Sequence, residues 1–123
     1  MMYRICIVED DEGIQDVLTI ILQRSGYDIC VFAEGTTVMQ PGFHMPDLFL
    51  IDKQLPDTDG LDICRFLKTS PLTANIPVVM MSAYPNARQL CQDAGADAFI
   101  EKPFQLEHLL STVKRFTASE AVA

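Results

Sequence analysis

The stretch Leu48-Phe49-Leu50-Ile51-Asp52 decides the fold of this chain. Four successive apolar residues are typical of a strand buried on both faces, as in a parallel sheet. A half-exposed strand would instead alternate apolar and polar residues. The acid that ends the run is costly to bury without a partner. The stretch therefore predicts a central strand over residues 47–51, with a functional carboxylate at its carboxyl end.

Apolar and amphipathic runs alternate on both sides of this stretch. By length and periodicity, we expect the other strands at 3–8, 28–32, 76–81 and 98–101. We expect helices at 12–25, 36–40, 59–68, 86–94 and 105–116. The second of these helices is weak because Pro41 and Gly42 should end it early. The fourth also looks short.

Five strands that alternate with five helices indicate an α/β fold with right-handed crossovers. We predict a doubly wound (βα)5 three-layer sandwich whose five-stranded parallel sheet has the order 2-1-3-4-5. The 123 residues fit one domain, 1–123. Residues 117–123 follow the last helix, and no further domain is expected within this sequence, which is either a stand-alone protein or a piece of a larger one. In such a sheet the site lies beyond the carboxyl ends of strands one and three.

Composition narrows the class of protein. The net charge is −8, which by itself attracts neither nucleic acid nor an anionic membrane, so we expect contact with neither. No apolar run approaches the length of a membrane span. The four cysteines lie in apolar segments without zinc-site spacing. Reduced thiols and a cytoplasmic location follow as expectations.

Polar side chains occur where the predicted strands end. Glu9 and Asp10 follow strand one, and Asp52 follows strand three. Three converging carboxylates repel one another, and a hard cation such as Mg²⁺ relieves that repulsion. Ser82 and Lys102 follow strands four and five, and both suit the oxygens of a phosphoryl group. Since an aspartate can act as a covalent nucleophile for phosphate, the set indicates phosphoryl transfer to Asp52.

Plainer structural roles compete with these interpretations. Glu9 and Asp10 could be merely an acidic helix start, although we favour a functional role because Asp52 should face them. Asp57 and Asp59 are better explained as turn or helix-cap residues than as ligands.

The strand ends together resemble the receiver domain of bacterial two-component systems, over nearly the whole chain. The resemblance is carried by Val8-Glu9-Asp10-Asp11-Glu12, Asp52-Lys53-Gln54-Leu55-Pro56-Asp57-Thr58-Asp59-Gly60, Met81-Ser82-Ala83 and Glu101-Lys102-Pro103-Phe104. It implies that Asp52 is the phosphoacceptor. It also implies that Mg²⁺ (or Mn²⁺) is held by Asp52, Asp10, Glu9 and the backbone carbonyl of Gln54.

The same resemblance implies roles for the remaining residues. Ser82 and Lys102 would contact the phosphoryl group, and the bond before Pro103 would be cis. Phe99 would be a switch aromatic that turns inward with Ser82, although core packing explains it equally well. Gln54 and Tyr84 would border the path of hydrolytic water, so bulky Tyr84 should slow dephosphorylation.

The implied function is a signalling module rather than an enzyme, because it would catalyse only its own phosphorylation and slow dephosphorylation. Its partners would be a histidine kinase or histidine phosphotransfer protein and a downstream effector. A homodimer could form through the expected fourth helix, fifth strand and fifth helix. A haloacid-dehalogenase-like phosphatase, a flavodoxin-type electron carrier and a structural pseudo-receiver are the alternatives. The phosphatase is disfavoured because Asp52 does not begin an Asp-x-Asp pair. The electron carrier is disfavoured because acids stand where a flavin phosphate would bind, and the pseudo-receiver because the set of acids, Ser and Lys is complete.

Overall fold

A computed structural model describes residues 2–40 and 42–117. Within these residues, the strands are β1 (Arg4–Val8), β2 (Asp28–Phe32), β3 (Leu48–Asp52), β4 (Val78–Ser82) and β5 (Ala98–Glu101). The helices are α1 (Glu12–Arg24), the 3₁₀ helix η1 (Gly35–Met39), α2 (Gly60–Thr69), α3 (Ala87–Asp93) and α4 (Leu106–Thr117). Of the expected tail at 117–123, Thr117 instead ends α4, and residues 118–123 lie outside the described residues, as does the predicted helix breaker Pro41.

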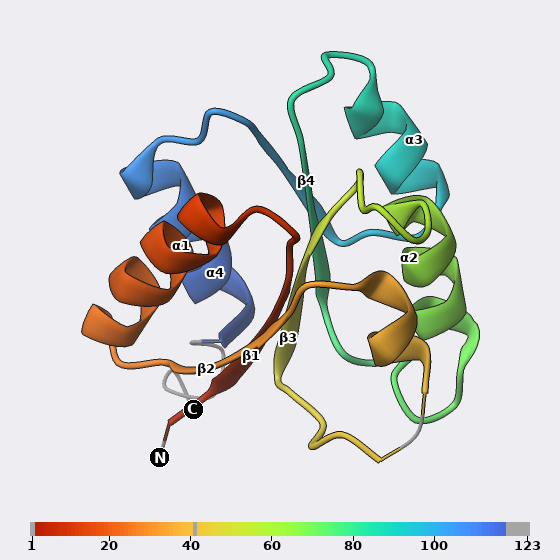
Figure 1. Ribbon diagram of the computed structural model, residues 1–123, viewed down its shortest axis with the longest axis horizontal. Helices are drawn as coiled ribbons and strands as arrows, with labels where there is room; N and C mark the ends of the chain where they lie inside the picture. The colour runs from red at the N-terminus through yellow and green to blue at the C-terminus, as the bar shows by residue number, and fades with distance from the viewer. Residues whose placement is uncertain (1, 41, 118–123) are drawn as a thin grey trace.

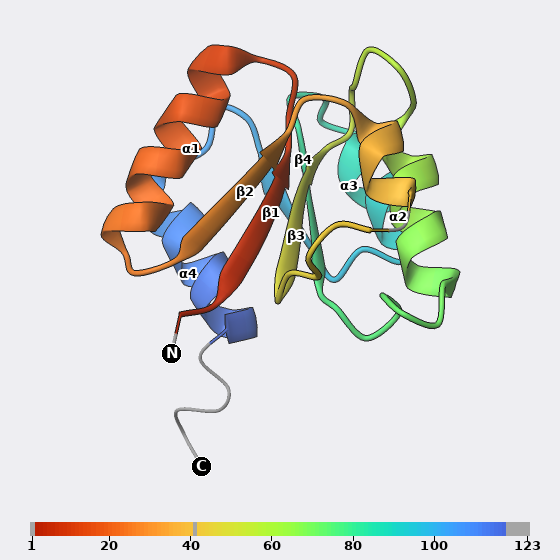
Figure 2. The ribbon, with the colours of Figure 1, turned by 60° about the horizontal axis from the view of Figure 1, so that its bottom comes forward.

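The five strands form one parallel sheet in the order β2-β1-β3-β4-β5, which confirms the predicted topology. Helices α1 and α4 cover one face, and η1, α2 and α3 cover the other (Figure 1 and Figure 2). The register pairs Val8 of β1 with Ile51 of β3. The carboxyl ends of these two strands therefore lie side by side at one edge of the sheet.

The central strand β3 separates two apolar cores. All five of its residues are buried. Leu48 and Leu50 pack into the core beneath α1 and α4, whereas Phe49 and Ile51 pack into the core beneath η1, α2 and α3. This arrangement is the physical reason for the unbroken apolar run, because successive side chains of a strand point to opposite faces. Asp52 ends the strand where both cores end.

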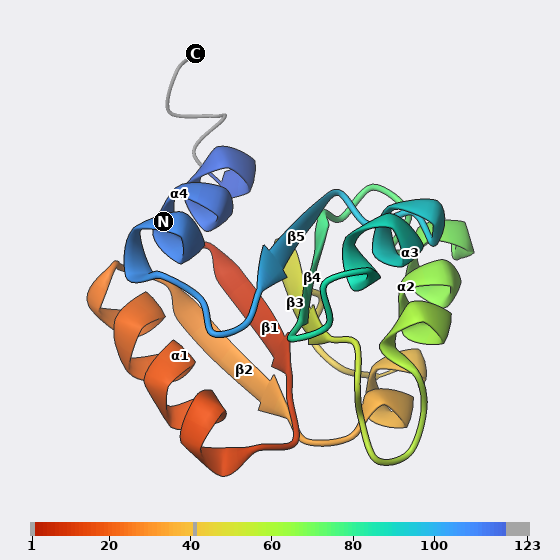
Figure 3. The ribbon, with the colours of Figure 1, turned by 90° about the horizontal axis from the view of Figure 1, so that it is seen from above.

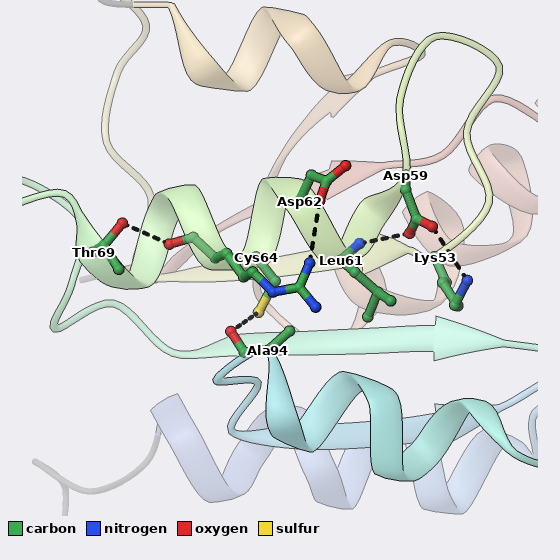
Figure 4. A network of polar contacts seen from close by, with 8 residues as sticks. Lys53, Asp59, Leu61, Asp62, Cys64, Thr69 and Ala94 are labelled. Carbon is green, nitrogen blue, oxygen red and sulfur yellow. Dashed lines mark hydrogen bonds and ion pairs between the residues drawn. The ribbon is translucent and has the colours of Figure 1, made fainter.

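Aspartate side chains cap the N-termini of two of the helices. The carboxylate of Asp11 accepts a hydrogen bond from the backbone N–H of Ile14 at the start of α1. The carboxylate of Asp59 accepts one from Leu61 at the start of α2, where it also pairs with Lys53 at 3.5 Å (Figure 4). These contacts satisfy N–H groups that a helix leaves without partners in its first turn. They agree with the cap role that the sequence favours for Asp59.

The second crossover differs from the expected helix at 36–40, because the structure has the 3₁₀ helix η1 there instead of an α-helix. Gly35 starts η1 in close contact with the side chains of Ile63 and Thr58, where any Cβ would clash. The carboxylate of Asp57 accepts hydrogen bonds from the backbone N–H groups of Gly35 and Thr36. The crossover is therefore held by the loop after β3 rather than by a long helix of its own. The predicted shortness of the fourth helix is confirmed, since α3 has seven residues.

An Asp57→Ala variant is expected to unfold more easily by about 1 kcal/mol, the usual cost of losing a cap. Hydrogen bonds from the backbone, chiefly that of Thr36, lower the pKa of Asp57. A lowered pKa means that the stabilisation is present above the unfolded value of about 3.9 and is lost as the pH falls through the folded value. Urea titrations of the variant and the wild type at pH 7 and near pH 3 measure this difference.

Asp62→Ala is the matched control, because Asp62 is exposed (Figure 4) and, among the described residues, its carboxylate pairs with Arg65 alone on the surface of α2. Its removal should change the free energy of unfolding by less than about 0.5 kcal/mol. Equal losses in the two variants would contradict the role assigned to Asp57.

Candidate functional site

Three carboxylates meet at the edge of the sheet where β1 and β3 end. Asp52 is the last residue of β3 and is 5% exposed, and Glu9 directly follows β1 and is 1% exposed. Asp10 comes next and is exposed. One carboxylate oxygen from each of the three lies within 4.8 Å of the others. The structure thus brings together the three acids that the sequence predicts to converge.

Lys102 enters this cluster from the end of β5. Its Nζ lies 2.6 Å from Oε1 of Glu9 and 3.3 Å from Oδ1 of Asp52. The backbone N–H of Lys102 donates to the carbonyl of Ser82, so β4 holds the lysine in place. The peptide bond that follows, between Lys102 and Pro103, is cis. One ammonium group therefore faces two buried carboxylates that come from two neighbouring strands.

Burial dominates the ionisation of the cluster. Burial raises the pKa of Asp52, and Lys102 and the backbone N–H of Gln54 oppose that rise. Burial also raises the pKa of Glu9, again against the hydrogen bond from Lys102. For Lys102, burial would lower the pKa, but the two carboxylates outweigh it and the net pKa is raised. Lys102 therefore stays charged in the site. The charged forms of Glu9 and Asp52 would be stabilised by any further positive charge.

Ser82 lies at the end of β4, next to Met81, the residue paired in register with Asp52. Its side chain is fully buried, and its Oγ accepts a hydrogen bond from the backbone N–H of Tyr84 at 3.1 Å. The hydroxyl proton stays available to a second acceptor. The ring of Tyr84 is half exposed.

The loop after β3 folds back on Asp52. The N–H of Gly60 donates to the carbonyl of Lys53, and Gln54 forms a β-bridge with Asp59. A Cβ at position 60 would collide with the backbone of Asp52 and Lys53. Glycine is therefore required here for close backbone approach. This packing fixes the main chain on which Asp52 and Gln54 sit.

Phe99 lies in the middle of β5 and is buried in the core beneath α2 and α3. The guanidinium of Arg88, in α3, stacks over its ring at 5.0 Å from the centroid. The structure thus places the expected switch aromatic inside the protein, with Arg88 over it. It does not bring Phe99 into the acidic cluster.

The donor set of the cluster fits a hard divalent cation. All three side-chain donors are carboxylate oxygens, which Mg²⁺ prefers, and exposed Asp10 leaves an open side for water and substrate oxygens. Two of the acids are buried and have raised pKa values, so a cation would relieve their repulsion. The oxygen-only set, without cysteine or histidine, argues against a zinc site.

Comparison with known proteins places this geometry in a family. The family model of the response regulator receiver domain matches residues 5–114, which contain every residue of the cluster. The chain belongs to the response regulator receiver family. Receiver domains of this family are signalling domains of two-component systems under the control of phosphorylation. The fold of this receiver domain and its acidic edge agree with that class.

Relatives are similar over most of this receiver. The DNA-binding dual master transcriptional regulator RpaA of Synechocystis is 36% identical over 116 residues, which are 92% of this chain and 48% of RpaA. The DNA-binding response regulator MtrA of Mycobacterium tuberculosis is 35% identical over 117 residues, which are 93% of this chain and 50% of MtrA. The chain therefore spans about half the length of these curated relatives.

Solved structures show the same fold. The response regulator DrrB of Thermotoga maritima matches with a TM-score of 0.87 and 30% identity, over 98% of this chain and 54% of DrrB. The receiver domain of the sensor histidine kinase PA1611 of Pseudomonas aeruginosa matches with a TM-score of 0.87 and 25% identity, over 97% and 100% of the two chains. That structure has a magnesium ion coordinated in its active-site cleft.

The relatives and the helix lengths bear on contact with nucleic acid and with membranes. The expected absence of nucleic-acid contact is not supported, because the relatives are named as DNA-binding regulators. The net charge describes this chain alone, which spans about half the length of such relatives. No helix within the described ranges combines the length and the apolar character that a bilayer crossing requires.

Three contacts around the site are not predicted by the sequence. The side-chain amide of Gln15 donates to the backbone carbonyl of Glu9 and so ties α1 to the acidic loop. Arg88 covers Phe99, and Asp57 holds η1. Gln15 follows Glu9 by six residues, which matches neither the i,i+3 nor the i,i+4 spacing of a helix, so no local pattern marks the first contact. The other two join segments far apart in sequence, which no local pattern reveals.

Proposed function

We propose that Asp52 accepts a phosphoryl group and that this modification controls the signalling output of the chain. The observation that supports the proposal is the meeting of buried Asp52 with Glu9, Asp10 and Lys102 at the open edge of a parallel sheet. An oxygen of Asp52 forms a new bond to phosphorus, while the bond from phosphorus to the donor's imidazole nitrogen breaks. The electron pair of that bond stays with the imidazole, which then takes up a proton.

The side chains around Asp52 have complementary tasks. Lys102, whose Nζ lies 3.3 Å from Asp52, would pair with a phosphoryl oxygen, and the hydroxyl of Ser82 would donate to another. Glu9, Asp10, Asp52 and the carbonyl of Gln54 would hold Mg²⁺, or Mn²⁺ in its place, which neutralises negative charge on the transferred group when bound. Beyond its own phosphorylation and slow dephosphorylation, the chain would catalyse no reaction.

The proposed donor is a histidine kinase or histidine phosphotransfer protein. Support comes from an apolar hollow of about 540 Å³ beside Lys102, lined by the start of α1 and the loop after β5. Val17 in this hollow is 48% exposed, and Ile14 and Phe104 line it with Val17. An apolar surface next to the reactive carboxylate suits a partner that presents its phosphohistidine from a helix. A cytoplasmic location belongs to the same proposal, supported by four unpaired cysteines.

The proposed switch links Ser82 to Phe99. When Asp52 is modified, Ser82 would move toward the phosphoryl group. The ring of Phe99, expected from the sequence to turn inward at this step, is already buried in the unmodified chain, so modification would hold it in that position. Buried Ser82 lies one residue along β4 from Met81, and Met80 pairs in register with Phe99. The two residues thus belong to adjoining strands, and a local charge event at Asp52 biases a two-state element. A downstream effector would recognise the altered surface.

Incubation of the chain with Mg²⁺ and phosphoramidate tests the proposed function. We expect a mass gain of one phosphoryl group, lost on treatment with acid or hydroxylamine, because an acyl phosphate is labile to both. Chelation of the divalent ion should prevent the gain. Turnover of a phosphate ester, or a bound flavin with its yellow absorbance, would instead favour one of the alternative functions and contradict this one.

Tyr84→Ala is expected to shorten the lifetime of the phosphoryl group several-fold. Tyr84 follows Ser82 by two residues, its backbone N–H donates to the Oγ of Ser82, and its ring is half exposed, so we expect the ring to border the approach to the site. A bulky ring at this position should hinder the entry of hydrolytic water. The decay of phosphorylated protein, followed by mass after the donor is removed, measures the lifetime.

Leu72→Ala is a suitable control for the Tyr84 experiment, because it also truncates a large exposed side chain but lies beyond α2. An unchanged lifetime in Tyr84→Ala would count against the role of the ring. An unchanged rate of phosphorylation in the same variant would show that only hydrolysis responds.

A further inference from the structure

Two thiols lie together at the edge of the sheet that β2 forms. β2 is the outermost strand on this side, and β1 is its neighbour (Figure 3). The register pairs Cys30 of β2 with Cys6 of β1. Because the two strands are parallel and the two residues are in register, both side chains point to the same face of the sheet. Cys6 belongs to the core beneath η1, α2 and α3, so the pair lies on that face.

The two thiols also interact directly. Burial raises the pKa of Cys6, and Cys30 raises it further, both as a neighbouring negative charge and through a side-chain hydrogen bond. Arg4 acts in the opposite direction, but its guanidinium is already paired with Asp28 at 2.9 Å. Two thiolates side by side repel each other, and a cation bound between them relieves that repulsion.

The surroundings of the pair differ on its two sides. On the inner side, Cys6 is in register with Phe49 of β3, and the ring of Phe43 packs against Phe49 with 6.3 Å between the centroids. Cys6 itself is 1% exposed. On the outer side, Cys30 is only half-buried and belongs to an edge strand. The pair is therefore accessible from the side of Cys30 and apolar on the side of Cys6.

The spacing of the strands suits a bound ion better than a disulfide. Neighbouring strands lie about 4.8 Å apart, and their side chains stand roughly perpendicular to the sheet. Two metal–thiolate bonds of about 2.3 Å each, the length found for zinc, span about 4.6 Å when the ion lies between the sulfurs. A disulfide requires the sulfurs to be only about 2.05 Å apart. Adjacent strands thus hold two thiolates at the spacing of an ion, whereas a disulfide would draw them together.

We propose that Cys6 and Cys30 form a binding site for a soft cation of the Cu(I) type, held between the two thiolates. Thiolates are soft ligands, and they select Cu(I) over hard cations. Structural Zn²⁺ sites use four ligands, and no further His, Cys, Asp or Glu of the described part of the chain joins this pair in a group of three. As each copper–sulfur bond forms, the thiol releases its proton to solvent, and copper keeps its oxidation state.

The remaining two cysteines provide an internal comparison. Burial, followed by the neighbouring Cys91 of α3, raises the pKa of Cys64 of α2 to about 11. Both residues are fully buried, and the Sγ of Cys64 donates to the backbone carbonyl of Ala94. These two thiols are therefore near each other but enclosed by helices, without an accessible member. We expect them not to take up the ion.

Anaerobic titration of the 123-residue chain with Cu(I), in competition with a chromogenic Cu(I) chelator, tests the proposal. We expect one Cu(I) per chain, with two sulfur neighbours in its X-ray absorption spectrum. Cys30→Ser should weaken binding at least about tenfold, because even the loss of a group that supports a metal ligand costs that much. Cys6→Ala should have the same effect. Since Cys30 is half-buried, its variant keeps the test valid if the loss of buried Cys6 disturbs the fold.

Cys64→Ala and Cys91→Ala are the matched controls, because each removes a buried thiol from the same side of the sheet. Their affinity for Cu(I) should stay within about twofold of the wild type. Asp52→Asn should also bind Cu(I) normally, which separates this site from the proposed phosphorylation.

Three results would overturn the proposal: unchanged binding in Cys30→Ser, equal losses in the two control variants, or Zn²⁺ bound as tightly as Cu(I). A fourth is a Cys6–Cys30 disulfide that forms in air, seen by mass as the loss of both thiol hydrogens, in a chain that binds no Cu(I).

Discussion

In an Asp52→Asn variant, incubation with Mg²⁺ and phosphoramidate is expected to leave the mass of the chain unchanged. The amide has no carboxylate oxygen to attack phosphorus, and the neighbouring acids have other environments. Glu9 is 1% exposed with Lys102 at 2.6 Å, so it is less accessible than Asp52. Asp10 is exposed in the loop and is a proposed ligand. Labelling should therefore fall from near one group per chain to background.

The Asp52→Asn variant should fold normally, which makes the loss informative. Burial raises the pKa of Asp52, so its charge is not a source of large stability, and Lys102 keeps Glu9 as a partner. We expect the free energy of unfolding to change by no more than about 1 kcal/mol. Asp57→Asn and Asp62→Asn serve as controls that should label like the wild type. Labelling of Asp52→Asn at the wild-type level would place the acceptor elsewhere.

A Lys102→Met variant is expected to lose about 3 kcal/mol of stability at pH 7. The ammonium is the counter-charge for Glu9 and Asp52, whose side chains are 1% and 8% exposed. Removal of one partner from a buried ion pair leaves an uncompensated charge, which is more damaging than removal of both. Urea unfolding in the presence of a chelator measures the loss. Adding Glu9→Gln to this variant should restore part of the stability.

Lys53→Met is the matched control for Lys102→Met. Lys53 has a similarly buried side chain, but its partner Asp59 is 44% exposed at 3.5 Å. Its removal should cost less than about 1 kcal/mol. A loss in Lys102→Met no larger than this would contradict the role of Lys102 as a buried counter-charge.

The pH dependence of the Lys102→Met effect has a defined sign. The pKa of Lys102 is raised in the fold, since its carboxylate partners outweigh burial, so its contribution is complete below the unfolded value of about 10.4 and disappears as the pH rises through the folded value. At the acidic end, burial raises the pKa values of Glu9 and Asp52. The destabilisation should therefore shrink as the pH falls and these two acids take up protons.

Much of the fold follows from local patterns in the chain. Strand β3 can be predicted because both of its faces are buried, which requires an unbroken apolar run. The acids at the ends of β1 and β3 can be predicted as site residues because they directly follow such apolar runs. Strand order follows from the rules for parallel sheets. Lys102 could be expected at the site because β5 ends there, next to Pro103.

The rest depends on contacts that sequence does not display. Residues 36–40 read as a weak helix, but Asp57 draws their start into a 3₁₀ turn from 21 or 22 residues away. The stacking of Arg88 on Phe99 likewise requires α3 and β5 to be placed first. The ring of Tyr84 is half exposed, and no spacing rule gives that orientation. Tertiary packing decides such details.

The carboxylate of Asp57 also couples two loops mechanically. It belongs to the segment that follows β3, but it accepts hydrogen bonds from the backbone N–H groups of Gly35 and Thr36, which follow β2. A shift of that segment on modification of Asp52 would pull the neighbouring loop with it, without any rearrangement of the strands between. Modification of Asp52 would then alter two separate surfaces of the chain, one at α3 and one at η1. Two different partner proteins could therefore each recognise the modified state.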